Sequence, residues 1–425
     1  MGVFFGTDGI RGIVGEDLSF ELALKCGKAL SQLKPGCKVI IGRDSRISGQ
    51  MLSQSISLGL VLGGASVIDV GIATTPSISY LTLCLGFDFG VVISASHNPA
   101  EYNGIKVFNS SGQKLTDKEE SQIEKLMVHE SPLNYNKVGN YLYKPSILKK
   151  YINFLCAQVT NIKDINIAVD CANGASRSIA RRVFAKLGVK AKFLSMASGD
   201  KINYKCGATY PQKVANFVKK NGLDYGFCFD GDADRIVMVG SSGEIYSGDN
   251  IIYCLANNPK LFNNNVVVGT SLSNLGLELA LKEKHISLER ADVGDKYVIE
   301  KMQELGTNIG GEQSGHIIVS NLLPTGDGLL VALLLCNIMQ GTNPHKYLNF
   351  KAFPQVMINV STQDKLRAMG SEELAKAINY ATEELSGMGR VLVRPSGTEN
   401  KIRIMVEAQN QARALTLAQY IASKV

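Results

Sequence analysis

The regular alternation of short β-branched runs with longer helical patterns constrains the fold of this 425-residue chain more than any other feature. Runs such as KVIIG (38–42), INIAVD (165–170) and NVVVGT (265–270) predict strands, and the patterns at 49–64 and 211–221 predict helices. Strand–helix–strand units of this kind are typical of parallel or mixed sheets with helices on both faces. We therefore expect three similar α/β domains, although the residues alone do not establish a repeat.

The segment after Phe353-Pro354 has a different pattern. A strand, a helix, two strands and a closing helix follow one another, which predicts a smaller α+β domain at the C-terminal end. We expect four domains, with bounds at 1–145, 146–242, 243–352 and 353–425.

Composition excludes several classes of protein. The formal net charge of +7 is mild, and no Lys/Arg run suits nucleic acid. The nine cysteines are scattered and form no C-x-x-C pair, which favours a reducing compartment over a disulfide framework or zinc site. The first residues lack the pattern of a signal peptide, and the apolar helix at 328–339 is too short to span a bilayer. A cytoplasmic protein that binds neither nucleic acid nor membrane is the expectation.

The loop ISASHNPAEYNGIK (93–106) follows the buried strand predicted at GVVIS. Open α/β sheets bind ligands at such strand ends, so Ser96 and His97 are candidate site residues. Asn-Pro and Asn-Gly also favour ordinary turns. Taken alone, this loop fits a turn and a functional site equally well.

A second loop, FDGDADR (229–235), places three aspartates at alternate positions after another apolar strand. Side chains at alternate positions of an extended loop point the same way, and converging carboxylates need a cation between them. Hard oxygen ligands favour Mg²⁺ or Ca²⁺. The EF-hand alternative fails, because Arg235 and Ser241 occupy the positions that require Gly and Glu. We expect a metal at Asp230, Asp232 and Asp234, with Arg235 placed for a phosphoryl oxygen.

A third loop, GGEQSGH (310–316), again alternates polar side chains. Glu312, Ser314 and His316 would offer an acceptor, a hydroxyl and an imidazole on one face. That set suits the hydroxyl groups of a sugar, and it suits a polar edge strand equally well.

A fourth segment, RPSGTENKIR (394–403), resembles a phosphate-binding turn. Ser396, Gly397 and Thr398 offer hydroxyls and backbone N–H groups between Arg394 and Arg403, a set able to hold a phosphate dianion. Ser-Gly-Thr is also common turn chemistry. Neither a P-loop nor a dinucleotide fingerprint is present in the sequence.

The opening segment FGTDGIRG (5–12) contains Arg11 in a Gly-rich loop. The alternative is a flexible terminus. Arg11 becomes a site candidate only if the other four segments share a cleft.

Together and in this order, TDGIRG, VISASHNP with NGIK, DGDADR, GGEQSGH and RPSGTE resemble the α-D-phosphohexomutase family over essentially the whole chain. Within that family the resemblance is strongest to the bacterial phosphoglucosamine mutases. It implies four domains around a central active-site cleft, three of them α/β and similar to one another, as the strand and helix pattern also predicts.

The resemblance implies a role for each matching residue. Ser96 would carry the transferable phosphoryl group and, with Asp230, Asp232 and Asp234, would hold one Mg²⁺ per subunit. The other matches are Arg11, His97, Lys106 and Arg235 around the phosphoserine; Glu312, Ser314 and His316 toward the sugar; and Arg394, Ser396, Gly397, Thr398 and Arg403 toward the second phosphate.

The reaction that the resemblance implies interconverts glucosamine 6-phosphate and glucosamine 1-phosphate, which supplies amino sugar for UDP-N-acetylglucosamine and cell-wall synthesis. The phosphoserine would donate to a sugar phosphate, and the resulting 1,6-bisphosphate, which also acts as activator, would turn and return its other phosphate. The open alternatives are a glucose or mannose phosphomutase, a sugar-phosphate-binding protein without turnover, and a phosphatase. A homodimer is possible.

Two positions depart from the family pattern. Asn400 stands where Pro is common, and Lys296 stands where Arg is usual. Because Lys cannot make the bidentate contact of Arg, we expect phosphate affinity to differ while the reaction stays the same.

Overall fold

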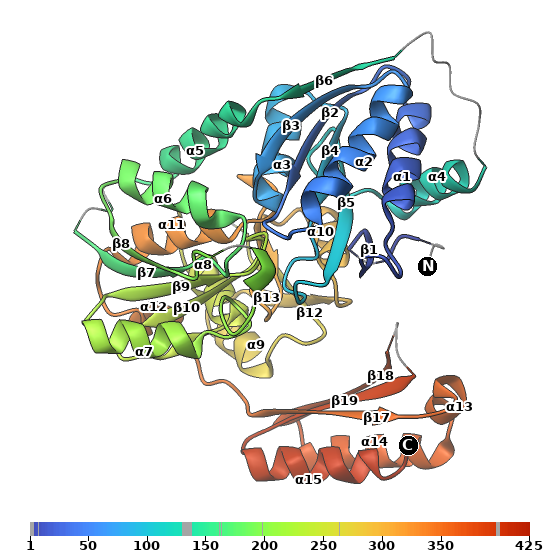
Figure 1. Cartoon of the computed structure of the whole chain (residues 1–425). Helices are drawn as coiled ribbons and strands as arrows, with labels where there is room; N and C mark the ends of the chain where they lie inside the picture. Colours follow the sequence, from blue (N-terminus) through green and yellow to red (C-terminus); the bar gives the residue numbers. More distant parts are fainter. Residues whose placement is uncertain are drawn as a thin grey trace.

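The computed structural model describes residues 4–6, 8–129, 138–160, 162, 164–197, 199–262, 264–396 and 400–425. In this part of the chain the elements form four sheets, each flanked by helices (Figure 1). The predicted class, three α/β domains and a smaller α+β domain, is confirmed. The predicted domain bounds stay a prediction.

The first domain holds a mixed six-stranded sheet in the order β1-β5-β4-β2-β3-β6. Strand β2 pairs in parallel with β3 and β4, whereas β5 runs antiparallel to both β4 and β1. Its elements are β1 (Ile10–Ile13), α1 (Phe20–Leu33), β2 (Lys38–Arg43), α2 (Gly49–Leu62), β3 (Ser66–Ile72), α3 (Thr75–Leu85), β4 (Phe89–Ile93), β5 (Tyr102–Asn109), α4 (Asp117–Val128) and β6 (Asn140–Tyr143).

The second domain holds five strands in the order β11-β10-β9-β7-β8, with β7 parallel to β8 and β9. Two short 3₁₀ turns, η2 (Pro145–Ile147) and η3 (Gly199–Lys201), lie beside its regular elements. These are α5 (Leu148–Ala157), β7 (Asn166–Asp170), α6 (Ser176–Lys186), β8 (Lys190–Leu194), α7 (Gln212–Asn221), β9 (Tyr225–Phe229), β10 (Ile236–Gly240) and β11 (Ile245–Tyr246).

The third domain repeats this plan with five strands in the order β13-β12-β14-β15-β16, of which β13, β12 and β14 are parallel. Its elements are α8 (Gly248–Ala256), β12 (Val266–Thr270), α9 (Leu275–Lys282), β13 (Ser287–Ala291), α10 (Asp295–Leu305), β14 (Ile309–Gly311), β15 (Ile317–Val319), β16 (Leu323–Gly326), α11 (Gly328–Met339) and α12 (His345–Leu348).

The fourth domain is a three-stranded antiparallel sheet in the order β17-β19-β18. In Figure 1 this sheet faces the rest of the molecule, and helices α14 and α15 cover its far side. Its elements are β17 (Gln355–Ser361), α13 (Lys365–Met369), α14 (Glu372–Leu385), β18 (Gly389–Pro395), β19 (Lys401–Ala408) and α15 (Gln411–Ala422).

The apolar core does not divide into the same four parts. One continuous cluster joins the first three domains, from Ile40 through Ile167 to Leu330, whereas domain four has a core of its own around Ile404. Helix α11 is apolar on nearly every face because it is buried in the shared core. Among the described residues, no helix is both long and apolar enough to cross a membrane.

Domain four is attached to domain three by a small polar junction. The Asn274 side chain accepts a hydrogen bond from Phe353 N at 2.9 Å and donates one to Phe353 O at 2.9 Å. Arg390 of β18 donates to the carbonyl oxygens of Ser271 and Ser273, both at 2.9 Å. Because domain four has a separate core, we expect a hinge at Phe353-Pro354.

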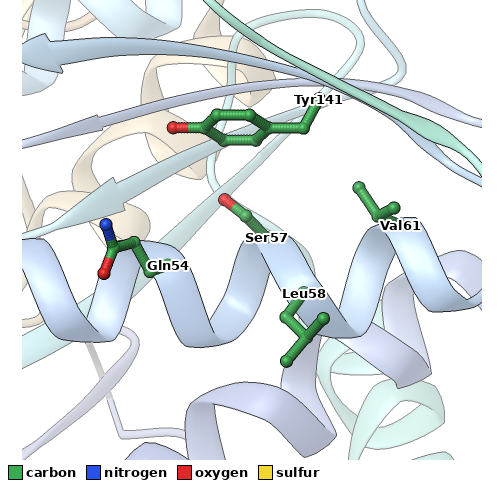
Figure 2. A pocket seen from close by; sticks show the side chains of 5 residues that line it. All are labelled: Gln54, Ser57, Leu58, Val61 and Tyr141. Carbon is green, nitrogen blue, oxygen red and sulfur yellow. The ribbon is translucent and has the colours of Figure 1, made fainter.

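A shallow apolar hollow of about 270 Å³ lies between helix α2 and the edge strand β6 (Figure 2). Its lining residues are Gln54, Ser57, Leu58, Val61 and Tyr141. None of the predicted site residues lines this hollow.

Candidate active site

Ser96 lies in the loop between β4 and β5, with only 1% of its surface exposed. Its backbone has φ of +50°, a left-handed conformation that a non-glycine residue adopts only when its surroundings impose it. Ser94 Oγ accepts a hydrogen bond from Ser96 N at 2.9 Å, and Asn203 Nδ2 donates to Ser96 O at 2.8 Å. The hydroxyl that we expect to react is therefore held on a rigid loop.

Arg46 forms the scaffold beneath that loop. Its fully buried guanidinium donates to four main-chain carbonyl oxygens: Ser96 at 3.1 Å, Asn98 at 2.8 Å, Tyr102 at 2.9 Å and Pro99. Asp44 neutralises Arg46 through a 3.0 Å contact with Nε and also accepts from Ser94 Oγ at 2.7 Å. One buried ion pair thus fixes both sides of the loop.

The three aspartates converge as predicted. Asp230, Asp232 and Asp234 are buried, and one carboxylate oxygen from each lies within 4.8 Å of the others. Ser96 Oγ donates a hydrogen bond to Asp230 Oδ2. A side chain at Gly231 would place its Cβ 2.6 Å from Ser96 O, so only glycine lets the aspartate loop approach the serine loop this closely.

The charges in this cluster call for a cation. Burial, reinforced by Asp234 and Asp232, raises the pKa of Asp230 well above its usual value. Asp232 Oδ2 accepts from Thr75 Oγ1 at 2.6 Å, while Asp232 Oδ1 has no hydrogen-bond partner in the described part of the chain. A buried orphan carboxylate oxygen beside two other carboxylates is what a hard divalent cation would satisfy.

Lys106 of β5 lies on the other side of the aspartates. Its ammonium contacts Asp232 at 3.0 Å, Asp234 at 3.1 Å and Asp8 of the opening segment at 3.2 Å. Burial alone would lower the pKa of Lys106, but these carboxylates hold it well above its usual value. Burial would raise the pKa of Asp234, but Lys106 and His316 hold it well below its usual value. Lys106 is therefore a fixed positive charge.

Two arginines and a histidine complete the surroundings of Ser96. Arg11 donates to Asn98 Oδ1 at 3.4 Å, and the buried Nε of Arg235 has no hydrogen-bond partner among the described residues. His97 Nδ1 lies 3.5 Å from Ser96 Oγ. Burial, with Arg235 and Arg11, lowers the pKa of His97 to about 4, so its ring is neutral at pH 7. This half of the site is suited to an anion.

The predicted sugar loop lies between β14 and β15. Glu312 accepts hydrogen bonds from Gly294 N at 3.2 Å and Ser314 Oγ at 3.1 Å. His316 is buried behind this pair, with Nδ1 3.8 Å from Asp234 Oδ2. Although burial would lower the pKa of His316, nearby Asp295 and Asp234 raise it. His316 thus contacts the aspartate cluster, and contact of Glu312, Ser314 and His316 with sugar stays a prediction.

In the predicted phosphate turn, Arg394 and Arg403 lie opposite each other on β18 and β19. Burial and Arg403 lower the pKa of Arg394, which an anion between the two would relieve. Arg403 Nη2 lies 3.5 Å from Ser396 Oγ. Gly397 and Thr398 lie outside the described residues.

Lys296 and Asn400, the two residues that depart from the family pattern, differ in their surroundings. Lys296 contacts Glu120 of α4 at 3.1 Å and also pairs with Asp117. It therefore joins domain three to domain one, a role for which a compact ammonium is sufficient. Asn400 is exposed and accepts a hydrogen bond from Thr362 N at 3.0 Å.

Several residues of the site were not predicted from the sequence. Arg46 and Asp44 lie in RDSR at the end of β2, and a polar cluster at a strand end was the available signal. Asp249 lies in the first turn of α8, accepts a hydrogen bond from Asn274 N at 2.8 Å and lies 3.5 Å from Gln313 Nε2, so it supports the sugar loop. Asn203 and Lys114 carried no local signal.

Four models of phosphoglucomutase/phosphomannomutase domains match the chain in order. Domain I matches residues 2–133, domain II 149–243, domain III 247–352 and the C-terminal domain 357–424. The chain belongs to this family, the α-D-phosphohexomutases. Of the five loops that suggested the resemblance, two lie in domain I and one in each of the other three domains.

Relatives and solved structures agree with this assignment. The phosphoglucosamine mutase of Bacillus mycoides is 43% identical over 430 residues, covering 97% of this chain and 95% of its own length. A phosphoglucomutase/phosphomannomutase family protein from Burkholderia thailandensis has the same fold, with a TM-score of 0.82, 23% identity and coverage of 98% and 96%. Aspergillus fumigatus N-acetylphosphoglucosamine mutase, solved with GlcNAc-6P and magnesium, gives 0.67 at 18% identity and coverage of 99% and 95%.

Proposed function

We propose that this protein interconverts glucosamine 6-phosphate and glucosamine 1-phosphate through a phosphoryl group carried by Ser96. The observation that carries the proposal is the position of Ser96 Oγ, hydrogen-bonded to Asp230 and 3.5 Å from Asp234 Oδ1 in a buried cluster of three carboxylates. A serine on a rigid loop, facing a metal-binding cluster on one side and cationic groups on the other, suits phosphoryl transfer. Full-length relatives named phosphoglucosamine mutase support the amino sugar as substrate.

The cluster fits Mg²⁺, one ion per subunit. Asp230, Asp232 and Asp234 would hold it together with the phosphorylated Ser96. When bound, the ion would neutralise charge that develops on the transferred phosphoryl group. The orphan oxygen of Asp232 and the raised pKa of Asp230 support this assignment, as both describe a carboxylate cluster with too much negative charge.

The protein's own residues would divide the remaining work. Arg11, Lys106 and Arg235 would bind phosphoryl oxygens, and the neutral ring of His97 would hydrogen-bond beside them. The Oγ–P bond of Ser96 breaks while a bond forms from phosphorus to a sugar hydroxyl oxygen, which gives the 1,6-bisphosphate. The proton that the hydroxyl loses is gained overall by Ser96 Oγ. The bisphosphate turns, and its other phosphate returns to Ser96.

Domain four would hold the phosphate that is not being transferred. Arg394, Ser396, Gly397, Thr398 and Arg403 would bind it, while Glu312 and Ser314 would contact sugar hydroxyls. The paired arginines of β18 and β19 support a dianion site, because two adjacent guanidinium groups repel each other without one. A cytoplasmic location suits the nine free cysteines.

A glucose or mannose phosphomutase is the second candidate, since the family includes both activities in its name. The test assays the purified protein in parallel with glucosamine, glucose and mannose 6-phosphates, with Mg²⁺ and a trace of the matching 1,6-bisphosphate. We expect the highest kcat/KM with glucosamine 6-phosphate. A clear preference for glucose or mannose phosphate would refute the amino-sugar assignment, and release of inorganic phosphate alone would indicate a phosphatase.

A further inference from the structure

Lys114 lies beside the site without belonging to any of its loops. It follows the turn after β5, where it forms an isolated bridge with Phe108, and 13% of its side-chain surface is exposed. Its ammonium lies 2.5 Å from Asp295 Oδ2 at the start of α10 and also pairs with Asp8 Oδ1. Lys114 thus joins a carboxylate of domain three to one of domain one.

Asp8 is shared among three cations. Besides Lys114, it pairs through Oδ2 with Arg11 and lies 3.2 Å from Lys106 Nζ. Burial would raise the pKa of Asp8, but Lys106, Lys114 and Arg11 hold it well below its usual value, so the carboxylate is ionised. An anion therefore lies directly against Arg11 and Lys106, two cations of the proposed phosphoryl-transfer site.

This arrangement poses an electrostatic problem. A carboxylate beside a phosphoryl-transfer site repels the incoming phosphate, and it competes with that phosphate for Arg11 and Lys106. Lys114 bonds the other oxygen of Asp8 and contacts neither Ser96 nor the aspartate cluster in the described structure. Its charge is therefore directed at Asp8 and Asp295.

We propose that Lys114 is a positioning residue for phosphoryl transfer, which neutralises Asp8 so that Arg11 and Lys106 remain available to the phosphoryl group on Ser96. Asp295 orients Lys114 for this role from the neighbouring domain. The inference rests on the proposed phosphotransfer at Ser96, whichever hexose phosphate is the substrate.

The alternative is that Lys114 has only a structural role and joins domains one and three through its salt bridges. The neighbouring contacts of Lys296 with Glu120 and Asp117 already join these domains in the opposite sense, with the cation on domain three. The two readings differ in which carboxylate matters. If Lys114 neutralises Asp8, Lys114 should become dispensable when Asp8 itself is neutralised by substitution. If Lys114 only joins the two domains, it should become dispensable when Asp295 is neutralised.

The experiment measures the single-turnover rate constant for phosphoryl transfer from phosphorylated Ser96 to the best hexose 6-phosphate of the parallel assay. The variants are K114M, K114R, K114M/D8N and K114M/D295N, with D8N and D295N alone as references. K34M is the matched control, because Lys34 also pairs with a domain-one aspartate, Asp88, outside the site. Thermal unfolding is recorded for each variant.

We expect K114M to slow transfer about 10- to 100-fold, the range seen when a supporting partner of a site residue is lost. K114R and K34M should stay near the parent. K114M/D8N should transfer as fast as D8N alone, while K114M/D295N should stay slower than D295N.

Three results would overturn the proposal. These are an unchanged rate in K114M, recovery through D295N in place of D8N, and failure of K114M/D8N to fold although D8N folds. A parent protein that transfers to none of the three sugars would instead refute the proposed function, and with it the inference that depends on it.

Discussion

The guanidinium of Arg46 donates a hydrogen bond to the main-chain carbonyl oxygen of Ser96, 3.1 Å away, from a position 50 residues earlier in the chain. Since the same group also binds the carbonyl oxygens of Asn98, Pro99 and Tyr102, it sets the path of the whole loop. The left-handed backbone of Ser96 persists because these bonds are made together.

Arg46→Lys should therefore lower kcat sharply. A lysine keeps the charge but has one nitrogen, which cannot reach four carbonyl oxygens at once. We expect a loss on the order of 100-fold, the cost of displacing a reacting group by about 1 Å. Arg43→Lys, at a half-buried neighbouring position, is the control. A correctly folded Arg46→Lys protein with the parent's kcat would show that the loop holds its shape without the guanidinium.

Asp232→Asn should weaken Mg²⁺ binding by about 100-fold or more, because it removes a charged ligand and not merely a supporting partner. Relief of the repulsion with Asp230 and Asp234 should leave the apo protein at least as stable as the parent. Titration calorimetry with Mg²⁺ measures the first effect and thermal unfolding the second. Asp224 precedes strand β9, whereas Asp230 follows it, so Asp224→Asn should change neither Mg²⁺ binding nor thermal stability. Parent-like activity of Asp232→Asn at limiting Mg²⁺ would contradict the metal site.

Asp249 should make stability depend on pH. Burial raises its pKa to about 6 from the usual 3.8, so the folded state binds its proton more tightly than the unfolded state does. This contribution to stability is complete below pH 3.8 and is lost as the pH rises through 6, at a cost of about 3 kcal/mol.

The variant Asp249→Asn removes that dependence while its side-chain oxygen can still accept from Asn274 N. The stability difference between variant and parent should shift in favour of the variant between pH 4 and 7. Chemical unfolding at several pH values measures it. A difference that does not change with pH would mean that Asp249 titrates normally in the folded protein.

Much of the fold could be predicted from the sequence, because most strands are runs of apolar residues and such runs predict buried strands. Strand β4, FGVVI, is buried at every position. Strand β6 could not be predicted in the polar stretch around 129–145, since all four of its residues are exposed and it forms through pairing with β3. Helix α13 is a short helix, and no apolar pattern marked it.

The site was predictable where several chemical groups lie close together in the sequence. The three aspartates of DGDADR converge because alternate side chains of one loop point together. Arg46 and Lys114 were missed because each acts across a distance of 50 or more residues through contacts that only the folded chain creates. The contact of His316 with Asp234 was not predicted, because it joins two loops that are far apart in the sequence. Contact of His316 with sugar stays a prediction.

Transfer of label from the isolated phosphoprotein tests whether the phosphoryl group passes through Ser96. The protein is phosphorylated with ³²P-labelled sugar 1,6-bisphosphate, freed of ligand and mixed with unlabelled glucosamine 6-phosphate and Mg²⁺. We predict that label leaves the protein within one turnover and appears in the bisphosphate and then in both monophosphates, that Ser94→Ala still accepts label, and that Ser96→Ala accepts none. If Ser96→Ala still accepts label, or if label leaves the parent only as inorganic phosphate, phosphoryl transfer to the sugar through Ser96 is ruled out.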